Sequence, residues 1–87
     1  MEMREAINRA KVGICDITGL KPASVVRCEK SGDGHKITIE LVEMSRIPAA
    51  TDVLGTYEVL LNATGDIETF HRTGMRLRGE APREPSV

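Results

Sequence analysis

The side chains best suited to catalysis or metal binding are few in this sequence. His35 and His71 have no second ligand at the short spacing that a metal site uses, and Cys15 and Cys28 form no Cys-x-x-Cys motif. There is no serine–histidine–aspartate set, no paired-carboxylate cleft and no glycine-rich phosphate loop. We therefore predict a protein that is not an enzyme and needs no metal or cofactor. Both histidines are expected in solvent, and both cysteines, which lie among apolar residues, as buried reduced thiols.

Charged side chains offer a second kind of chemistry, the binding of macromolecules. The 87-residue chain has a net charge of −1, which gives no overall attraction for nucleic acid or an acidic membrane. Residues 45–68 carry one basic and four acidic side chains, and residues 69–87 carry four basic and two acidic ones. Arg72, Arg76 and Arg78 share one strand parity and could follow a phosphate backbone, or pair with nearby acidic residues. With one Phe, one Tyr and no Trp to stack on bases, a nucleic-acid partner is not expected.

The hydrophobic spacing of the first segment predicts a helix of four to five turns. Gly19 is suited to the left-handed conformation that ends a helix, and Pro22 prevents the helix from restarting. The apolar stripe recurs every three or four residues and consists of Met3, Ile7, Ala10, Ile14 and Ile17.

After Pro22 the hydrophobic period changes to two, which is typical of strands. One helix followed by a four-stranded antiparallel meander is an α+β domain with the helix packed on one face of the sheet. The domain is expected to cover residues 1–79, and residues 80–87 to form a flexible tail with two prolines. The predicted strands are residues 24–30, 35–44, 53–62 and 67–78. The sheet face under the helix is expected to consist of Ile37, Ile39, Leu41, Tyr57, Val59 and Leu61.

The opposite face of the predicted sheet has no second helix to cover it. Antiparallel sheets tolerate one solvated face, but apolar residues among charges also suit a docking surface. If the strands pair evenly, Glu40 and Glu58 fall close together there, with Arg72 or Arg46 as the counter-ion. The residues expected on this face are Lys36, Glu40, Val42, Glu58, Leu60, Phe70 and Arg72.

The segment between the second and third strands is expected to interrupt the sheet. Pro48 lacks a backbone donor and disfavours a helical conformation at Ile47. Asp52 is placed to accept backbone N–H bonds and to form a turn before the third strand. Two interpretations of Arg46, Glu43 and Asp52 therefore stay open, a structural clamp of this loop and a partner-binding role.

Several short motifs in the second half of the chain carry a family resemblance through their combined spacing. They are Val42-Glu43, Arg46-Ile47-Pro48, Asp52-Val53-Leu54 and Tyr57-Glu58-Val59, followed by Gly65 and by a last strand with Phe70, Arg72 and Arg78. With these motifs the chain resembles the gas vesicle protein O family over roughly residues 6–79. It departs from the family at His35, where a Trp is common, and at Met75-Arg76, where an Arg-Tyr pair is usual.

The resemblance implies an accessory protein for gas vesicle formation that acts in the cytoplasm by protein binding. Its mean hydropathy of −0.20 is too polar for the repeating shell protein. Other gas vesicle proteins would be its partners, with homodimerisation and association with the finished vesicle left open. A regulator of gas vesicle gene expression, acting through nucleic acid or the transcription machinery, is the alternative.

No stretch approaches the roughly 18 apolar residues of a membrane span, so no membrane partner is expected. The candidate partner-binding residues are Arg46, Glu43, Asp52, Glu40, Glu58, Leu60, Phe70, Arg72, Arg76 and Arg78.

Overall fold

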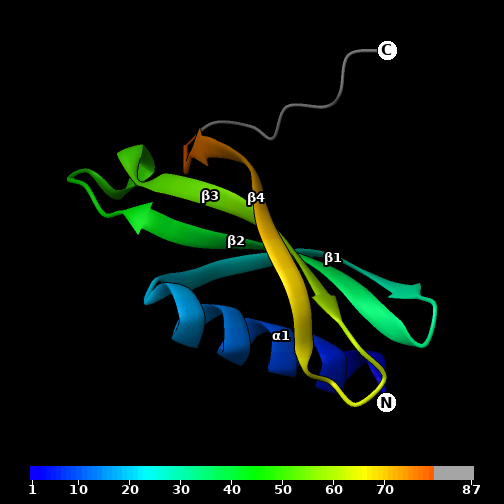
Figure 1. Ribbon diagram of the computed structural model, residues 1–87. Coiled ribbons are helices and arrows are strands. Elements are labelled where there is room, and N and C mark those ends of the chain that lie inside the picture. The colour runs from blue at the N-terminus through cyan, green and yellow to red at the C-terminus, as the bar shows by residue number, and fades with distance from the viewer. Residues whose placement is uncertain (80–87) are drawn as a thin grey trace, which may run out of the picture.

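The computed structural model describes residues 1–79, which form one helix and a four-stranded antiparallel sheet (Figure 1). The elements are α1 (Met3–Thr18), β1 (Lys21–Ser31), β2 (Gly34–Met44), the short 3-10 helix η1 (Ala49–Thr51), β3 (Val53–Leu61) and β4 (Ile67–Leu77). The strands lie in the order β1-β2-β3-β4, and α1 packs against one face of the sheet. The predicted α+β architecture is confirmed, whereas the predicted tail lies outside the described residues. No helix in residues 1–79 is long and apolar enough to cross a membrane.

The helix ends where it was predicted to end, but the residues that it buries against the sheet differ from the predicted apolar stripe. Gly19 has a φ of 73°, and its N–H donates to the carbonyl of Cys15 at 2.8 Å. The buried helical residues are Ala6, Ala10 and Ile14. The predicted burial of Met3 and Ile17, at the two ends of the stripe, was wrong, because both side chains are more than half exposed. Small side chains at Ala6 and Ala10 let the middle of the helix approach the sheet, while Met3 and Ile17 lie in its first and last turns.

The predicted core face of the sheet is confirmed. All six predicted residues join Ala6, Ala10 and Ile14 in one buried cluster. Cys15 and Cys28 are free thiols that pack against this cluster and are half-buried, less than expected. Burial raises the pKa of both thiols, so they are protonated near neutral pH.

Bulges in β4 change which face its side chains point to. Thr73 is an extra residue between the pairs Thr56–Gly74 and Tyr57–Arg72. Because each residue inserted into a strand shifts the alternation by one, Arg72 lies on the helix-covered face and Arg76 on the opposite one. The prediction that Arg72, Arg76 and Arg78 share one face was therefore wrong. Phe70, which pairs with Val59, also lies on the helix-covered face and not on the open one.

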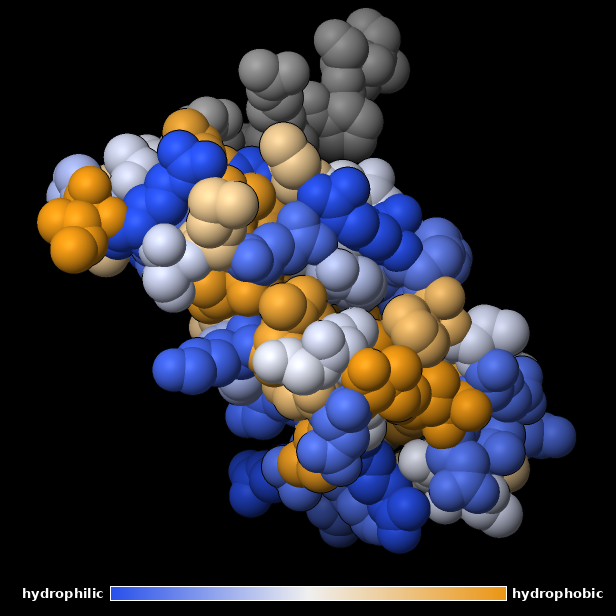
Figure 2. All heavy atoms as spheres, turned by 60° about the vertical axis from the view of Figure 1, so that its left-hand side comes forward, coloured by the Kyte–Doolittle hydropathy of each residue, from blue (hydrophilic) through white to orange (hydrophobic). Residues whose placement is uncertain are grey.

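The open face keeps most of its predicted residues, but its charges pair differently. In the register of the sheet, Glu40 lies opposite Thr56 and Glu58 opposite Thr38, so the two glutamates are not direct neighbours. Glu58 lies near Nζ of Lys36 (3.5 Å) and Nε2 of His71 (3.7 Å). The expected pairing of these glutamates with Arg72 or Arg46 was wrong. Figure 2 shows hydrophobic side chains on the visible surface as separate patches with charged residues between them.

The two histidines differ in exposure. His71 lies largely in solvent, as predicted. His35 is only 5% exposed, and its Nδ1 is a buried atom with no hydrogen-bond partner in residues 1–79. The expectation of a solvated His35 was wrong, because this residue has the strand parity of Ile37 and lies opposite Leu61 on the core face.

Candidate partner-binding surface

The sheet extends beyond the helix at one end. Lys21, the first residue of β1, pairs with Val42, so the last residues of β2 and the first residues of β3 project past β1 and α1 (Figure 1). Residues 45–52 connect β2 to β3 at this end, and β4 finishes beside them. We call this region, made of residues 43–55 and 72–79, the loop-end surface.

On the helix-covered face, an arginine of β4 reaches across β3 to a glutamate of β2. Arg72 donates from Nε and Nη2 to the two carboxylate oxygens of Glu43, at 2.8 and 2.7 Å. The hydroxyl of Tyr57 donates to Glu43 at 2.6 Å. The Glu43 side chain crosses β3 at Gly55, where a β-carbon would overlap its carboxylate. Glycine at this position is therefore a condition for the bridge.

This bridge holds both of its ends in the charged form. Hydrogen bonds from Arg72 first, and from Tyr57 in addition, lower the pKa of Glu43 despite its partial burial. The same carboxylate raises the pKa of Arg72. Burial first, and the bond to Glu43 second, raise the pKa of Tyr57. At neutral pH the three groups thus form a charge-assisted cluster with two parallel arginine–carboxylate bonds.

On the open face, a second arginine of β4 makes an equivalent crossing. Arg76 donates from Nε and Nη2 to Glu40 at 2.6 and 2.9 Å. The hydroxyl of Ser24 donates to the same carboxylate at 2.9 Å, which adds β1 to the bridge. Glu40 is buried, and these two donors, Arg76 first, lower its pKa. One carboxylate thus connects β1, β2 and β4 across the sheet.

The loop between β2 and β3 is closed by Asp52, as predicted. Its carboxylate accepts the backbone N–H of Arg46 at 2.7 Å and Nε of Arg78 at 3.2 Å. The backbone N–H of Arg78 also donates to the carbonyl of Asp52, at 2.9 Å. Hydrogen bonding to Arg46 first, and to Arg78 in addition, lowers the pKa of Asp52. Asp52 therefore clamps the loop, and the partner-binding role remains a prediction.

Three large apolar side chains are exposed around these bridges. Ile47 is fully exposed (101%), and Met44 and Met75 are 51% and 64% exposed. The thioether of Met44 accepts from Nε of Arg46 at 3.3 Å, and that of Met75 accepts from Arg72 at 3.1 Å. Among residues 1–79, the guanidinium of Arg46 has no carboxylate partner. Exposed methionines adapt to irregular partner surfaces, so this arrangement is suited to protein docking.

The loop-end surface brings together most of the predicted binding residues. Two predicted residues, Glu58 and Leu60, lie farther along β3 near Lys36 and His71, and Phe70 lies on the helix-covered face of β4. The sequence analysis missed Ile47, Met44 and Met75 as binding residues. For Ile47 the signal was an apolar residue in a loop where the sheet is interrupted, whereas Met44 and Met75 lie in strands and gave no such signal. The predicted residues at the loop end, or joined to it by the bridges, are Glu40, Glu43, Arg46, Asp52, Arg72, Arg76 and Arg78.

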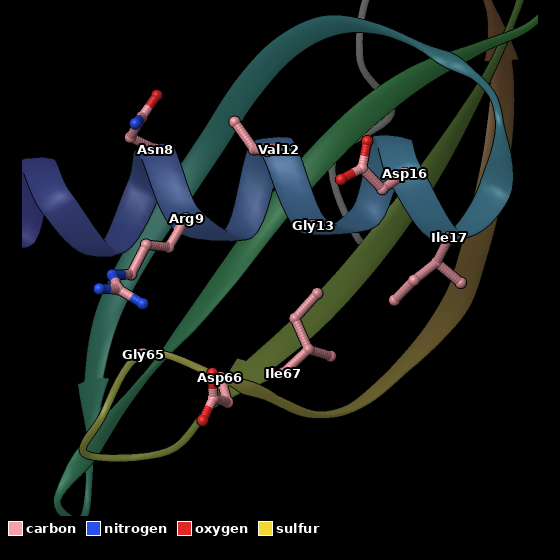
Figure 3. Close-up of a pocket in the computed structure, with 9 residues that line it drawn as sticks. All are labelled: Asn8, Arg9, Val12, Gly13, Asp16, Ile17, Gly65, Asp66 and Ile67. Atoms are coloured by element: carbon pink, nitrogen blue, oxygen red, sulfur yellow. The ribbon is translucent and has the colours of Figure 1, made fainter.

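A second surface lies on the side of α1, beside the loop that precedes β4 (Figure 3). A cavity of about 540 Å³ is lined by Val12, Ile17 and Ile67, together with Asp16 and Asp66. Figure 3 shows Ile17 and Ile67 pointing toward each other, with Asp16 above them and Asp66 below. We call this cavity the helix–hairpin pocket. Its lining also includes Asn8 and Arg9, so apolar side chains lie there beside charged groups of both signs.

Comparison with known proteins identifies relatives of the chain. The family model "Gas vesicle synthesis protein GvpO" matches residues 1–82. "Gas vesicle protein O" of Streptomyces sp. (strain CB03234) is 31% identical over 70 residues, which are 80% of this chain and 55% of that protein. "Gas vesicle protein O1" of Halobacterium salinarum is 26% identical over 82 residues, which are 94% of this chain and 69% of that protein. The chain thus spans little more than half the length of the Streptomyces relative. No solved structure matches the chain significantly.

Replacing Gly55 with alanine should break the bridge on the helix-covered face. The new β-carbon takes the place of the Glu43 carboxylate, which must then leave Tyr57 and Arg72. We expect the free energy of unfolding, measured in urea, to fall by about 1–3 kcal/mol, the usual range for overpacking. Gly74→Ala is the matched control, because a β-carbon there meets nothing within 4 Å. Equal stability of the two variants would contradict this role of Gly55.

Acid should weaken the loop-end surface. Glu40, Glu43 and Asp52 have lowered pKa values in the folded state, so their contribution is complete above the unfolded-state values near 4. This contribution is lost as the pH falls through the lower folded-state values. We expect a melting temperature that is steady from pH 6 to 8 and falls below about pH 5. Glu43→Gln should show a shallower acid decline, and Glu5→Gln, in an exposed pair, the wild-type decline. An unchanged decline in Glu43→Gln would refute the assignment.

Proposed function

The chain belongs to the gas vesicle synthesis protein GvpO family, and we propose that it is an accessory protein that supports gas vesicle formation by binding other proteins. The family match supports the process, since it covers residues 1–82 and the relatives carry the name gas vesicle protein O. The proposed site of action is the cytoplasm. The loop-end surface is the observation that supports the binding mode.

Two properties of the loop-end surface favour a protein partner. The exposed side chains of Met44, Ile47 and Met75 are apolar, and burying them against another protein removes their surface from water. The arginine–carboxylate bridges beneath them hold the backbone in place, so little conformational freedom is lost on binding. Exposed apolar side chains beside charged residues are a common composition of protein interfaces.

The same bridges argue against nucleic acid as the partner. Arg72, Arg76 and Arg78 each have a carboxylate within 3.2 Å. A phosphate would have to displace Glu43, Glu40 or Asp52, and each of these would then lose its cation. Tyr57, which could otherwise stack on a base, lies in the core. The charges of β4 thus serve the sheet itself.

A non-catalytic role agrees with the chemistry of the described residues. Glu40 and Asp52, the buried carboxylates of the described residues, are bound to arginine or backbone donors. Within residues 1–79, no group of three histidine, cysteine or acidic side chains is placed to hold a metal ion. The polar groups therefore have structural partners in place of substrate contacts.

Deleting the gene for this chain should leave cells with few or no normal gas vesicles. Vesicles counted by electron microscopy should fall by at least tenfold, while transcripts and products of the shell genes remain, and a plasmid copy should restore vesicles. Normal vesicle numbers in the deletion strain would contradict the proposal. Loss of the shell-gene transcripts would instead indicate a regulator of gene expression.

A further inference from the structure

The most exposed apolar side chain of the described residues is also held on a fixed backbone. Ile47 is fully exposed, on a loop whose two ends are bound by Asp52. Inside this loop the hydroxyl of Thr51 donates to the carbonyl of Pro48 at 2.7 Å, and the N–H of Gly79 donates to the carbonyl of Ala50 at 2.8 Å. A single exposed isoleucine is ordinary, but one presented on a closed loop is preorganised to enter a recess.

The residue beside Ile47 carries a charge that the rest of the described chain does not neutralise. Arg72, Arg76 and Arg78 pair with carboxylates, whereas Arg46 contacts only the Met44 thioether through its side chain. A surface that receives Ile47 should therefore be apolar and should offer a carboxylate next to the apolar recess.

The helix–hairpin pocket of the same chain has both properties. Val12, Ile17 and Ile67 are its apolar lining residues, and Asp16 and Asp66 supply carboxylates (Figure 3). Arg9, the cation of the lining, pairs with Glu5 at 3.3 Å. Asp16 is exposed and has no hydrogen bond or ion pair within residues 1–79, so its charge is available to a cation. The cavity of about 540 Å³ is open to solvent, so a loop of another molecule can reach it.

The loop and the helix–hairpin pocket lie far apart on the molecule, so a contact between them must join two molecules. The loop lies at the end of the sheet beyond α1, and the pocket lies between α1 and the β3–β4 hairpin loop (Figures 1 and 3). The described chain cannot fill its own pocket with its own loop, because the loop is bound to β4 by Asp52 and Ala50.

We propose that the partner of the Arg46-Ile47-Pro48 loop is the helix–hairpin pocket of a second copy of this chain. Ile47 enters between Val12 and Ile17 of the second copy, and Arg46 pairs with its Asp16. The contact is head-to-tail, so an open assembly keeps one free loop and one free pocket, and it either closes into a ring or grows as a filament. This inference rests on the proposed function in one respect: both assign protein binding to the loop-end surface.

The contact predicts weak, salt-sensitive self-association. One loop in one pocket covers less area than a standard protein interface, so dissociation constants in the micromolar to millimolar range are expected. Ile47→Asp should weaken association by at least tenfold, because the anchor no longer gains from leaving water. Arg46→Asp and Asp16→Arg should each weaken it, and the double variant should restore it. Val26→Asp, at an exposed apolar residue outside both surfaces, is the matched control and should leave association unchanged.

The decisive experiment mixes two variants of the purified chain. Ile47→Asp lacks a working loop and Ile17→Asp lacks a working pocket, so neither should self-associate in sedimentation velocity runs. Their mixture should form a one-to-one heterodimer and nothing larger, because it retains one loop and one pocket. Circular dichroism melting checks that each variant folds, and Val12→Asp replaces Ile17→Asp if the latter unfolds.

Three results would overturn the proposal. They are a wild-type chain that stays monomeric at millimolar concentration, an Ile47→Asp variant that associates like the wild type, and a mixture that forms no heterodimer although the wild type associates. The gene-deletion result is independent of all three. Failure of this contact is thus distinguishable from failure of the proposed function.

Discussion

The structure depends on arginines of β4 that reach carboxylates beyond their neighbouring strand. Backbone hydrogen bonds connect β4 to β3 only, but Arg72 and Arg76 cross β3 on opposite faces and bind Glu43 and Glu40 of β2. Gly55 leaves space for the first crossing, and the bulge at Thr73 places the two arginines on different faces. This end of the sheet has no helix over it, so these charged bridges replace the apolar packing that α1 provides elsewhere.

Periodicity predicted the parts of the fold that follow the regular alternation of strands. The six core residues from Ile37 to Leu61 lie on strands β2 and β3 and were all assigned to the correct face. β4 contains two register shifts, and a bulge has no signature in hydrophobic spacing, so Phe70 and Arg72 were assigned to the wrong face. His35 was predicted in solvent because histidine is polar, but its strand parity, which it shares with Ile37, places it on the core face.

Among the candidate binding residues, contacts between residues close in sequence could be predicted, and contacts between distant residues could not. Asp52 could be predicted as a loop clamp because the backbone donor of Arg46 lies only six residues away, whereas its bond to Arg78, 26 residues away, could not. The pairing of Glu43 with Arg72 joins residues 29 apart, and it depends on a bulge and on a glycine of a third strand. The helix–hairpin pocket likewise arises only when α1 is placed beside residues 65–67. Membership of the GvpO family directs attention to gas vesicle formation.

The central claim is that side-chain bonds to carboxylates hold the loop-end surface rigid enough to dock. Amide hydrogen exchange at Arg46 tests this claim most directly, because its N–H is bound to the carboxylate of Asp52. The account predicts a protected Arg46 amide that exchanges at least tenfold faster in Asp52→Ala, with the amides of Ile39 and Val59 in the core unchanged. An Arg46 amide that exchanges in the wild type as fast as in an unfolded chain would contradict it.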